Sequence, residues 1–335
     1  MILQQVKLQN FRSYTKKDFG FDLITIIVGE NGSGKSNLLE AIYLLATGKS
    51  FRADLESEMI NYSQAVGSVE GQFQYGENIK IVLTDGSMVG TRKKFLVNGV
   101  SRRMIDTVGK LRAVLFSPQD LELVTGSPSA RRRYLDFVIS QVDREYRRSL
   151  ISYEKGLRQR NKLLEMIREG LGQRNQLFFW DKLLIKNGDY LTMKRREYLA
   201  SFSGVYEVVY DASIISETRL KQYETEEVAA AATLVGPHRD DFVINLHGRD
   251  VSKYGSRGEQ RMAVLWLKTG ELHYLNSDTK PALLLDDIFS ELDHKHRQEV
   301  ETIVTQHTQN GGQVVMTSAD EHLLPEISGK VVKLG

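Results

Sequence analysis

The chain has 335 residues, 41% hydrophobic and 26% charged, which is the composition of a folded protein with room for one or two lobes. The absence of cysteine excludes disulfides, thiolate nucleophiles and zinc or iron–sulfur sites built on cysteine, and is compatible with the cytosol. The 45 basic and 43 acidic side chains nearly balance, so a nucleic-acid-binding surface would need a local excess of positive charge.

The N-terminal part is predicted to contain strands and one helix. No signal peptide follows Met1, and no apolar run approaches the roughly 20 residues that span a membrane, so we expect a cytoplasmic protein. Residues 2–8 alternate apolar and polar side chains, which predicts a half-buried strand, and 23–28 form a buried-strand pattern. A glycine-rich turn and a helix over 35–47 follow. Residues 69–104 are strand-like, and Asn98-Gly99 predicts a tight hairpin turn.

The middle of the chain is predicted to be helical. Apolar side chains from Tyr146 to Leu171 follow spacings of three, four and seven, so they mark one face of a long helix ending at 170–172. Tyr146 and Tyr153 in this stripe are expected to be core residues. A second helix over about 176–206 would complete an antiparallel hairpin.

The C-terminal part alternates helices and strands. From residue 251 the predicted order is loop, helix (259–275), strand (282–286), helix (295–306) and strand (313–317), which indicates an α/β fold with a parallel sheet. The simplest way to bury both α/β pieces is one shared sheet. We therefore expect residues 1–130 and 230–335 to form lobe I, and 131–229 to form an inserted, mainly helical lobe II.

A phosphate-binding pattern follows the second predicted strand. Residues Gly29-Glu30-Asn31-Gly32-Ser33-Gly34-Lys35-Ser36 match G-x-x-x-x-G-K-S. The glycines let backbone N–H groups point at one phosphate, and the following helix adds its positive N-terminus. Lys35 would reach the β- and γ-phosphates, and Ser36 would bind Mg²⁺. The alternative is a chance match, but the strand before the motif and the helix after it favour a nucleotide site.

A second pattern supplies the carboxylates that such a site needs. Residues 281–287 form a buried strand that ends in Asp286 and Asp287. Asp286 would hold Mg²⁺ through water, and Asp287 could polarise an attacking water. The alternative is a turn in which an Asp only caps the next segment.

A third pattern marks another helix start. Ser256, Gly258 and Gln260 form S-x-G-x-Q, and Ser256 with Glu259 could make a capping box. Gly258 in a first turn costs helix stability, however, and it would let the helix N-terminus approach a ligand closely. Because the chain has one lysine-bearing loop, this second N-terminus could complete the nucleotide site of another copy.

Together these motifs resemble the ABC-type ATPases of DNA repair, which are related to the heads of Rad50 and of chromosome-structuring proteins. Within that superfamily the chain is similar to the RecF family. The resemblance starts at residues 10–14, covers nearly the whole chain and is carried by three stretches: 118–136, 234–241 and 284–293. It implies an α/β fold of the ABC-type ATPase head, a mixed sheet with a P-loop core, carrying the helical insert.

The same resemblance implies an activity and partners. These are an ATP-dependent homodimer with ATP held between the glycine-rich loop of one subunit and the S-x-G-x-Q motif of the other, slow hydrolysis, and sequence-independent binding to gapped or junction DNA. RecO and RecR proteins are the implied partners in loading recombinase onto single-stranded DNA. The implied site residues are Arg12 near the nucleotide, Arg52 directed at the catalytic centre, and Asp293 in a D-loop of residues 290–293.

Three positions depart from the pattern of these relatives. Gln119 stands where the family usually has an acid, and it could be the residue that senses Mg²⁺. Asp287 stands where the wider superfamily has Glu, and its shorter side chain agrees with slow turnover. Ser318-Ala319 stand where the superfamily has a switch histidine that senses the γ-phosphate, so this chain lacks that histidine.

Positive charge is concentrated in two places. Residues 131–174 contain 12 Lys or Arg against six Asp or Glu. The predicted hairpin strands carry candidate DNA contacts at Arg92, Lys93, Lys94, Arg102 and Arg103. A solvated helix face or, for 131–133, a structural role explains the helical cluster as readily as DNA does. Any DNA contacts should be to phosphate. His238 is expected to be structural or to contact the other lobe rather than to be catalytic.

Three other classes of protein remain to be weighed. A small-molecule kinase has a glycine-rich loop but needs neither S-x-G-x-Q nor a D-loop. The ATPase subunit of a membrane transporter has both, but its helical insert is short. An ATP-gated scaffold or chromosome-structuring-type head without significant turnover stays open, and measured turnover with and without DNA would separate it from a weak ATPase.

Overall fold

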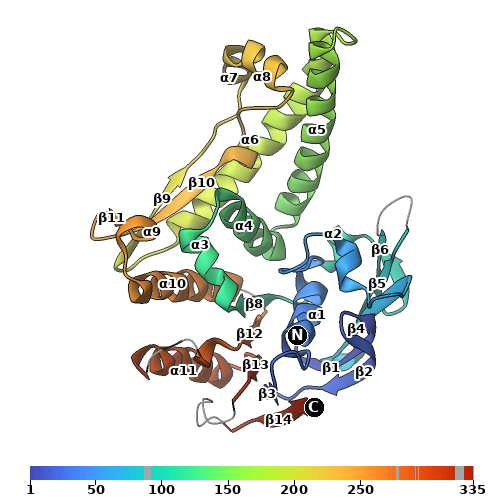
Figure 1. The fold of residues 1–335 in the computed structure, drawn as a ribbon, viewed down its shortest axis with the longest axis vertical. Helices are drawn as coiled ribbons and strands as arrows, with labels where there is room; N and C mark the ends of the chain where they lie inside the picture. Colours follow the sequence, from blue (N-terminus) through green and yellow to red (C-terminus); the bar gives the residue numbers. More distant parts are fainter. Residues whose placement is uncertain (87–91, 277–278, 291, 293, 321–327, 335) are drawn as a thin grey trace. The chain divides into compact units, whose positions relative to one another are not determined.

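The computed structural model describes residues 1–86, 92–276, 279–290, 292, 294–320 and 328–334 (Figure 1). The chain divides into two compact units, Met1–Asp120 with Lys268–Gly335, and Leu121–Leu267. The expected boundaries, after 130 and 229, differ from these. The second boundary comes later because β10 (Asp241–Leu246) pairs along its whole length with β9 (Tyr206–Asp211), which keeps it in the second unit.

The first unit contains a five-stranded parallel sheet with the order β14-β3-β13-β12-β8. Its strands come from both ends of the chain: β3 (Ile24–Gly29), β8 (Ala113–Phe116), β12 (Ala282–Asp286), β13 (Val314–Ser318) and β14 (Lys330–Leu334). This confirms that the two α/β pieces share one sheet. Since the carboxyl ends of parallel strands meet at one edge, the phosphate loop and both Asp residues of 286–287 come to the same edge.

An antiparallel sheet lies on the other side of helix α1 (Lys35–Thr47), which contacts strands of both sheets (Figure 1). Its order is β2-β1-β4-β5-β6-β7. The bounds are β1 (Leu3–Phe11), β2 (Tyr14–Gly20), β4 (Val66–Phe73), β5 (Asn78–Thr84), β6 (Arg92–Val97) and β7 (Val100–Arg102). Asn98 and Gly99 have φ of 51° and 76°, which confirms the tight β6–β7 turn.

Short helices complete the first unit. They are α2 (Met104–Thr107) and the 3₁₀ turns Glu56–Met59, Gln74–Gly76, Pro118–Leu121 and Ile288–Ser290, together with the longer α11 (His294–Gln309). Helix α10 (Arg257–Leu275) crosses the division between the units. No helix among the described residues is both long and apolar enough to cross a membrane.

The second unit is built on helices α4 (Pro128–Val142), α5 (Arg144–Arg168) and α6 (Phe178–Ala200). Helices α5 and α6 pack as the expected antiparallel hairpin, and Tyr146 and Tyr153 are buried core residues, as predicted. Helix α6 ends earlier than expected because residues 206–211 form β9, part of a sheet with the order β11-β10-β9. The smaller elements are α3 (Glu122–Thr125), Arg174–Leu177, α7 (Glu217–Gln222), α8 (Glu224–Ala230), Pro237–Arg239, β11 (Arg249–Asp250) and α9 (Val251–Tyr254).

Candidate nucleotide-binding site

The loop between β3 and α1 has the conformation that its glycines permit. Gly32 and Gly34 have φ of 88° and 101°, a region that residues with a Cβ rarely adopt. A Cβ on Gly34 would also lie 2.6 Å from the Tyr14 hydroxyl. The Lys35 ammonium donates to the carbonyls of Gly29 (2.7 Å) and Glu30 (3.0 Å). The hydroxyl of Ser33 is buried without a hydrogen-bond partner in the described part of the chain, so the loop holds a polar group ready for a ligand.

The end of β12 supplies the carboxylate beside this loop. Asp286 is 4% exposed, and its Oδ1 accepts hydrogen bonds from the hydroxyls of Ser36 and Thr317, each at 2.9 Å. Burial raises the pKa of Asp286, while these two hydroxyls and the charge of Arg52 act in the opposite direction. One carboxylate and one hydroxyl fit Mg²⁺, which takes its other ligands from phosphates and water. Among the described residues no group of three or more His, Cys, Asp or Glu could form a metal cage instead.

Asp287 is held in place by three hydrogen bonds. Its φ of 51° is unusual for a residue other than glycine. Its N–H donates to the Thr317 hydroxyl (3.0 Å), and its carboxylate accepts from the N–H of Ala319 (3.3 Å). Its carbonyl accepts from the Ser290 hydroxyl (2.7 Å). A main-chain N–H, that of Ala319, therefore contacts Asp287 at the position where related proteins have the switch histidine.

Thr317 is a site residue that sequence reasoning did not single out. It is the last residue but one of β13 and lies directly opposite Asp286 in the parallel register. A polar side chain at the carboxyl end of a strand next to the acidic strand is the signal that could have found it, but only with the strand order known.

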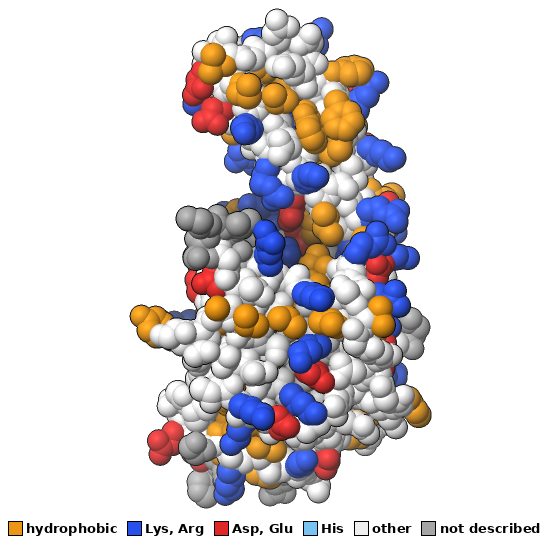
Figure 2. Space-filling model, turned by 90° about the vertical axis from the view of Figure 1, so that its right-hand side faces the viewer, with side chains coloured by type: hydrophobic (Ala, Val, Ile, Leu, Met, Phe, Trp, Pro, Cys, Tyr) orange, Lys and Arg blue, Asp and Glu red, His pale blue; other side chains and the backbone are white. Residues whose placement is uncertain are grey.

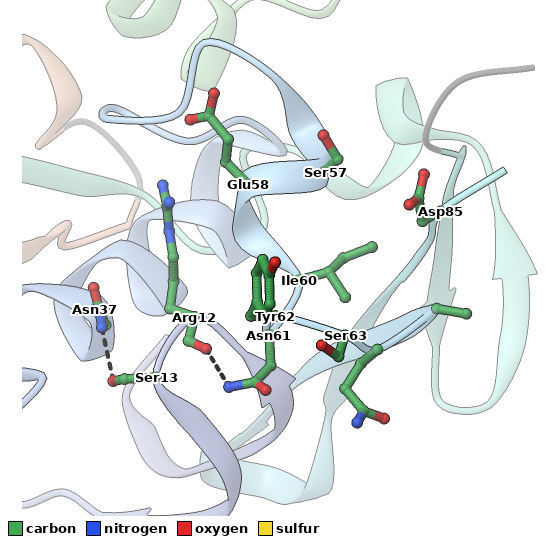
Figure 3. A pocket seen from close by; sticks show the side chains of 12 residues that line it. Arg12, Ser13, Asn37, Ser57, Glu58, Ile60, Asn61, Tyr62, Ser63 and Asp85 are labelled. Atoms are coloured by element: carbon green, nitrogen blue, oxygen red, sulfur yellow. Dashed lines mark hydrogen bonds between the residues drawn. The ribbon is translucent and has the colours of Figure 1, made fainter. Parts of the chain in front are cut away.

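The two arginines expected near the nucleotide both lie around α1. Arg12 makes a bidentate ion pair with the fully buried Glu40, through Nε (2.9 Å) and Nη2 (2.7 Å). Arg52 donates to Asn37 Oδ1 (3.1 Å), and Asn37 donates to the Ser13 hydroxyl (2.9 Å; Figure 3). Because Asn37 follows Ser36 directly, both guanidinium groups are tied to the first turns of the helix that begins at the phosphate loop.

A pocket of about 850 Å³ lies on this side of α1 (Figure 3). Arg12, Ser13 and Asn37 line it together with residues 57, 58, 60–65 and 85. Asn61 fixes its wall by donating to the Arg12 carbonyl (2.6 Å), and the ring of Tyr62 is 94% exposed. No motif marks the segment 57–65, so sequence reasoning did not single out this pocket wall.

The S-x-G-x-Q motif begins α10 and belongs to the second unit. Ser256 donates to the Glu259 carboxylate through its hydroxyl (2.8 Å) and its N–H (2.7 Å), and the Glu259 N–H returns to the hydroxyl (3.3 Å), so the capping box is formed. These donors lower the pKa of Glu259. Gln260 donates to the carbonyls of Val251 and Ser252. A Cβ on Gly258 would meet nothing closer than the Ser256 hydroxyl at 4.0 Å, so packing does not require a glycine here.

Comparison with known proteins now identifies the family. The model for the RecF/RecN/SMC N terminal domain matches residues 2–334. The chain is 36% identical to the DNA replication and repair protein RecF of Herpetosiphon aurantiacus, over 96% of this chain and 94% of the relative. The RecF protein of Thermomicrobium roseum is 37% identical, over 89% of each chain. The chain belongs to the RecF family.

Solved structures confirm the expected RecF-family fold. Two structures of RecF, described as the recombination mediator protein of the RecFOR pathway, contain ATP and the analogue ATPγS. They match with TM-scores of 0.88 and 0.87 at 31% and 32% identity, over 99% of this chain and 95% and 96% of theirs. The Smc head domain from Pyrococcus furiosus, bound to part of ScpA, matches with a TM-score of 0.50 at 17% identity, over 96% of this chain and 90% of its own. The fold is that of an ABC-type ATPase head.

Of two further RecF-family positions, Gln119 and Asp293, the structure describes Gln119. Gln119 is exposed in the turn after β8, at the edge of the sheet where Asp286 lies. The pKa of its neighbour Asp120 is raised, chiefly by burial and also by the charge of Asp286. The positive charge of Lys268 and the hydrogen bond from the Ser117 N–H (2.6 Å) act in the opposite direction and do not cancel this effect. Asp293 of the expected D-loop lies outside the described residues.

The candidate DNA contacts on the β6–β7 hairpin are not equivalent. Lys93 points to the inner face of β6, where its ammonium contacts Glu56 and donates to the Gly48 carbonyl (2.7 Å), and burial lowers its pKa. Strand alternation explains this difference, because Arg92 and Lys94 point to the opposite face and are exposed. Arg102 is exposed, and Arg103 is exposed but paired with Asp106 (2.9 Å). The Lys93 ammonium is therefore held by acceptors of the protein itself, which makes Lys93 a weaker candidate for DNA contact than Arg92 and Lys94.

The motif residues of the second unit form internal contacts. Arg131 makes a bidentate pair with Asp241 (2.6 and 2.9 Å), and Arg132 donates to the Asp240 carbonyl (2.8 Å). His238 lies between the Thr233 carbonyl (2.9 Å) and the Tyr153 hydroxyl (2.8 Å), and burial lowers its pKa to about 4. His238 is a structural histidine, as expected, and the Arg131 guanidinium is engaged in an ion pair within the second unit.

Proposed function

We propose that this chain is a weak ATPase of DNA replication and recombinational repair, which binds Mg²⁺-ATP and dimerises on DNA. The observation that carries the proposal is the meeting of the phosphate loop with Asp286, through the 2.9 Å hydrogen bond from Ser36. It is supported by the buried hydroxyl of Ser33, which has no partner among the described residues and can donate to a phosphate oxygen. The names of the relatives, which refer to DNA replication, repair and recombination mediation, support the proposed biological process.

Each part of the site has a role in this proposal. Lys35 and the loop N–H groups bind the β- and γ-phosphates, and the pocket beside Arg12 and Asn37 receives the nucleoside. Ser36 and Asp286, with Gln119 as a further candidate, would hold Mg²⁺, which when bound neutralises phosphate charge. Asp287 orients the attacking water and accepts its proton, and Arg52 stabilises developing charge.

The second copy completes the site. Ser256, Gly258 and Gln260 open a helix whose N-terminus can approach a phosphate, and Asp293 follows as the D-loop acid. Because the chain has one lysine-bearing loop and one such motif, each dimer would hold two composite sites. The open space around Gly258 supports this role, since an ordinary helix start gains nothing from a glycine there.

DNA and protein partners complete the proposal. The exposed side chains Arg92, Lys94, Arg102 and Arg103 are candidates for phosphate contacts with gapped or junction DNA, read without regard to sequence. RecO and RecR proteins are the proposed partners in loading recombinase onto single-stranded DNA. An ATP-gated scaffold is the second candidate, because the short Asp287 and the missing switch histidine both favour slow turnover.

Sedimentation of the protein with ATP, with ADP and with a gapped duplex tests the proposal. We expect a dimer with ATP, a monomer with ADP, and co-sedimentation of the dimer with the gapped duplex when ATP is present. Lys35→Ala should stay monomeric under all conditions. ATP binding by Lys35→Ala with wild-type affinity would contradict the proposed site, and zero turnover with and without DNA would favour the scaffold.

A further inference from the structure

The hairpin tip, residues 168–186, exposes large apolar side chains. Phe178 and Phe179 at the start of α6 are 61% and 63% exposed, and Leu171 in the preceding loop is 71% exposed. Hydrophobic side chains lie among Lys and Arg side chains at the upper end of Figure 2, the end to which the α5–α6 hairpin extends in Figure 1. Neighbouring aromatic rings left in water mark an interaction site more often than chance exposure.

The rings of the hairpin tip are held by their neighbours. The Lys182 ammonium lies 4.2 Å from the centre of the Phe178 ring, a cation–π contact. Phe179 meets the ring of Trp180 edge to face, with 5.0 Å between centroids. Both phenylalanines are thus braced on one side while most of their surface stays open, so they form a preorganised platform for a flat apolar group.

The charges around the platform favour an anionic partner. On residues 155–186 the exposed Lys and Arg outnumber the exposed Asp and Glu by seven to two. The acids are Glu165 and Glu169, whereas Asp181 is paired with the buried Arg160 (2.7 Å). The exposed cations are Lys155, Arg158, Lys162, Arg168, Arg174, Lys182 and Lys186, of which Arg174 also pairs with Glu224.

The order of side chains along α6 combines the two properties. Phe178, Lys182 and Lys186 follow one another at intervals of four, so they line one exposed face of the helix. A stacking ring followed by cations at regular spacing fits a polymer that alternates flat bases with phosphates. An apolar protein segment would use the rings but would have no use for the cations.

We propose that the hairpin tip binds single-stranded DNA, with bases stacked on Phe178 and Phe179 and phosphates contacting the flanking Lys and Arg. Double-stranded DNA does not offer free base faces, so the tip would select the single-stranded part of a gap. This inference deepens the proposed function, and it rests on it in naming DNA as the partner.

Oligo(dT) and a blunt duplex of equal charge test the tip on the full chain. Base stacking close to Trp180 should quench its fluorescence, and Trp180→Phe should remove that response while Trp266 remains. Phe178→Ala/Phe179→Ala should weaken oligo(dT) binding about tenfold or more, and should leave ATP-dependent duplex binding unchanged. Tyr75→Ala, which removes an exposed aromatic ring from the first unit, is the control and should change neither.

The outcomes separate the tip from the nucleotide site. Lys35→Ala should keep the oligo(dT) response at Trp180, because the tip needs no nucleotide. Wild-type oligo(dT) affinity in Phe178→Ala/Phe179→Ala would overturn the tip proposal. So would a result in which this variant binds DNA normally but no longer binds a protein partner. If the wild-type protein still dimerises and binds duplex DNA with ATP, the proposed function stands and only the proposal for the hairpin tip is contradicted.

Discussion

The hydroxyl of Thr317 donates a hydrogen bond to the carboxylate of Asp286 across neighbouring strands, with 2.9 Å between the two oxygens. The same hydroxyl accepts the N–H of Asp287 at 3.0 Å. One side chain on β13 therefore fixes both the acid proposed to hold Mg²⁺ and the acid proposed to orient water.

Thr317→Val should lower ATP turnover about tenfold or more, because it removes one of the two hydrogen bonds to Asp286 Oδ1 and leaves the N–H of Asp287 without a partner, at a cost of roughly 1–3 kcal/mol. ATP binding should change little, since Lys35 and the loop are untouched. Thr317→Ser keeps the hydroxyl and should retain most activity. Steady-state turnover measured beside equilibrium ATP binding checks this, and equal turnover in Val and Ser variants would contradict it.

Asp287→Asn should bind Mg²⁺-ATP and accumulate the dimer, with hydrolysis reduced by about a hundredfold or more. Asn tolerates a positive φ and keeps an oxygen for the Ala319 N–H, so the turn should survive the change. Single-turnover hydrolysis and sedimentation with ATP measure the two effects. Wild-type hydrolysis in this variant would place the catalytic base elsewhere.

Ser256→Arg should leave ATP binding by the monomer nearly intact and block ATP-induced dimerisation, since a bulky cation would fill the place of the partner's γ-phosphate. Mixed with Lys35→Ala, it should recover part of the ATPase activity, because their heterodimer contains one composite site with Lys35 and Ser256 both intact. ATP affinity and mixing assays check this. Loss of ATP affinity as severe as in Lys35→Ala would mean that the motif serves its own subunit.

Binding to duplex DNA should need ATP and weaken steeply with salt, with about −0.9 in the log–log slope for each neutralised duplex phosphate. Arg92→Ala/Lys94→Ala should make the slope shallower by about two if both side chains contact phosphate. Binding titrations at several salt concentrations, on duplexes of unrelated sequence, measure it. A slope near zero, or strong dependence on base sequence, would argue against phosphate contacts.

His238 should make the second unit sensitive to acid. Its pKa is lowered from the ordinary 6.5 to about 4, so between these values the unfolded chain binds a proton that the folded chain does not. This difference in proton binding lowers the free energy of unfolding as the pH falls from 6.5 to 4, by about 3 kcal/mol at most, and has no effect above pH 6.5. His238→Gln keeps a donor and an acceptor but does not titrate. Denaturant unfolding at pH 7 and pH 4.5 should show a smaller loss for this variant, and equal losses would contradict the assignment.

Sequence patterns predicted elements best where local signals bound a buried segment. Helix 35–47 and strand 282–286 have their predicted bounds, since glycines with positive φ at 34 and 48 delimit the helix and the strand is apolar up to Asp286. Strand β9 was not predicted, because the residues of its partner β10 lie 30 or more positions further along the chain. Pairing over such a distance leaves no local signal.

The candidate site divides along the same line. The motifs located Lys35, Ser36, Asp286 and Asp287, because each needs a particular residue type at a particular spacing. Thr317 and the pocket segment 57–65 reach the site through the order of strands and the path of the chain around α1, which no spacing reveals. The direction of the Lys93 side chain could not be predicted either, because it depends on which face of β6 is buried.

The order of the parallel sheet has a consequence for how the protein is made. Strand β3, which leads into the phosphate loop, pairs on one edge with β13 and on the other with β14, and Leu334 lies opposite Gly29. Both neighbours are synthesised nearly 300 residues later, as the sequence positions in these pairings require. A nascent chain can therefore build much of the antiparallel sheet and the helical hairpin on the ribosome while its phosphate loop still lacks support, so competence for nucleotide should appear only once translation has passed the last strand.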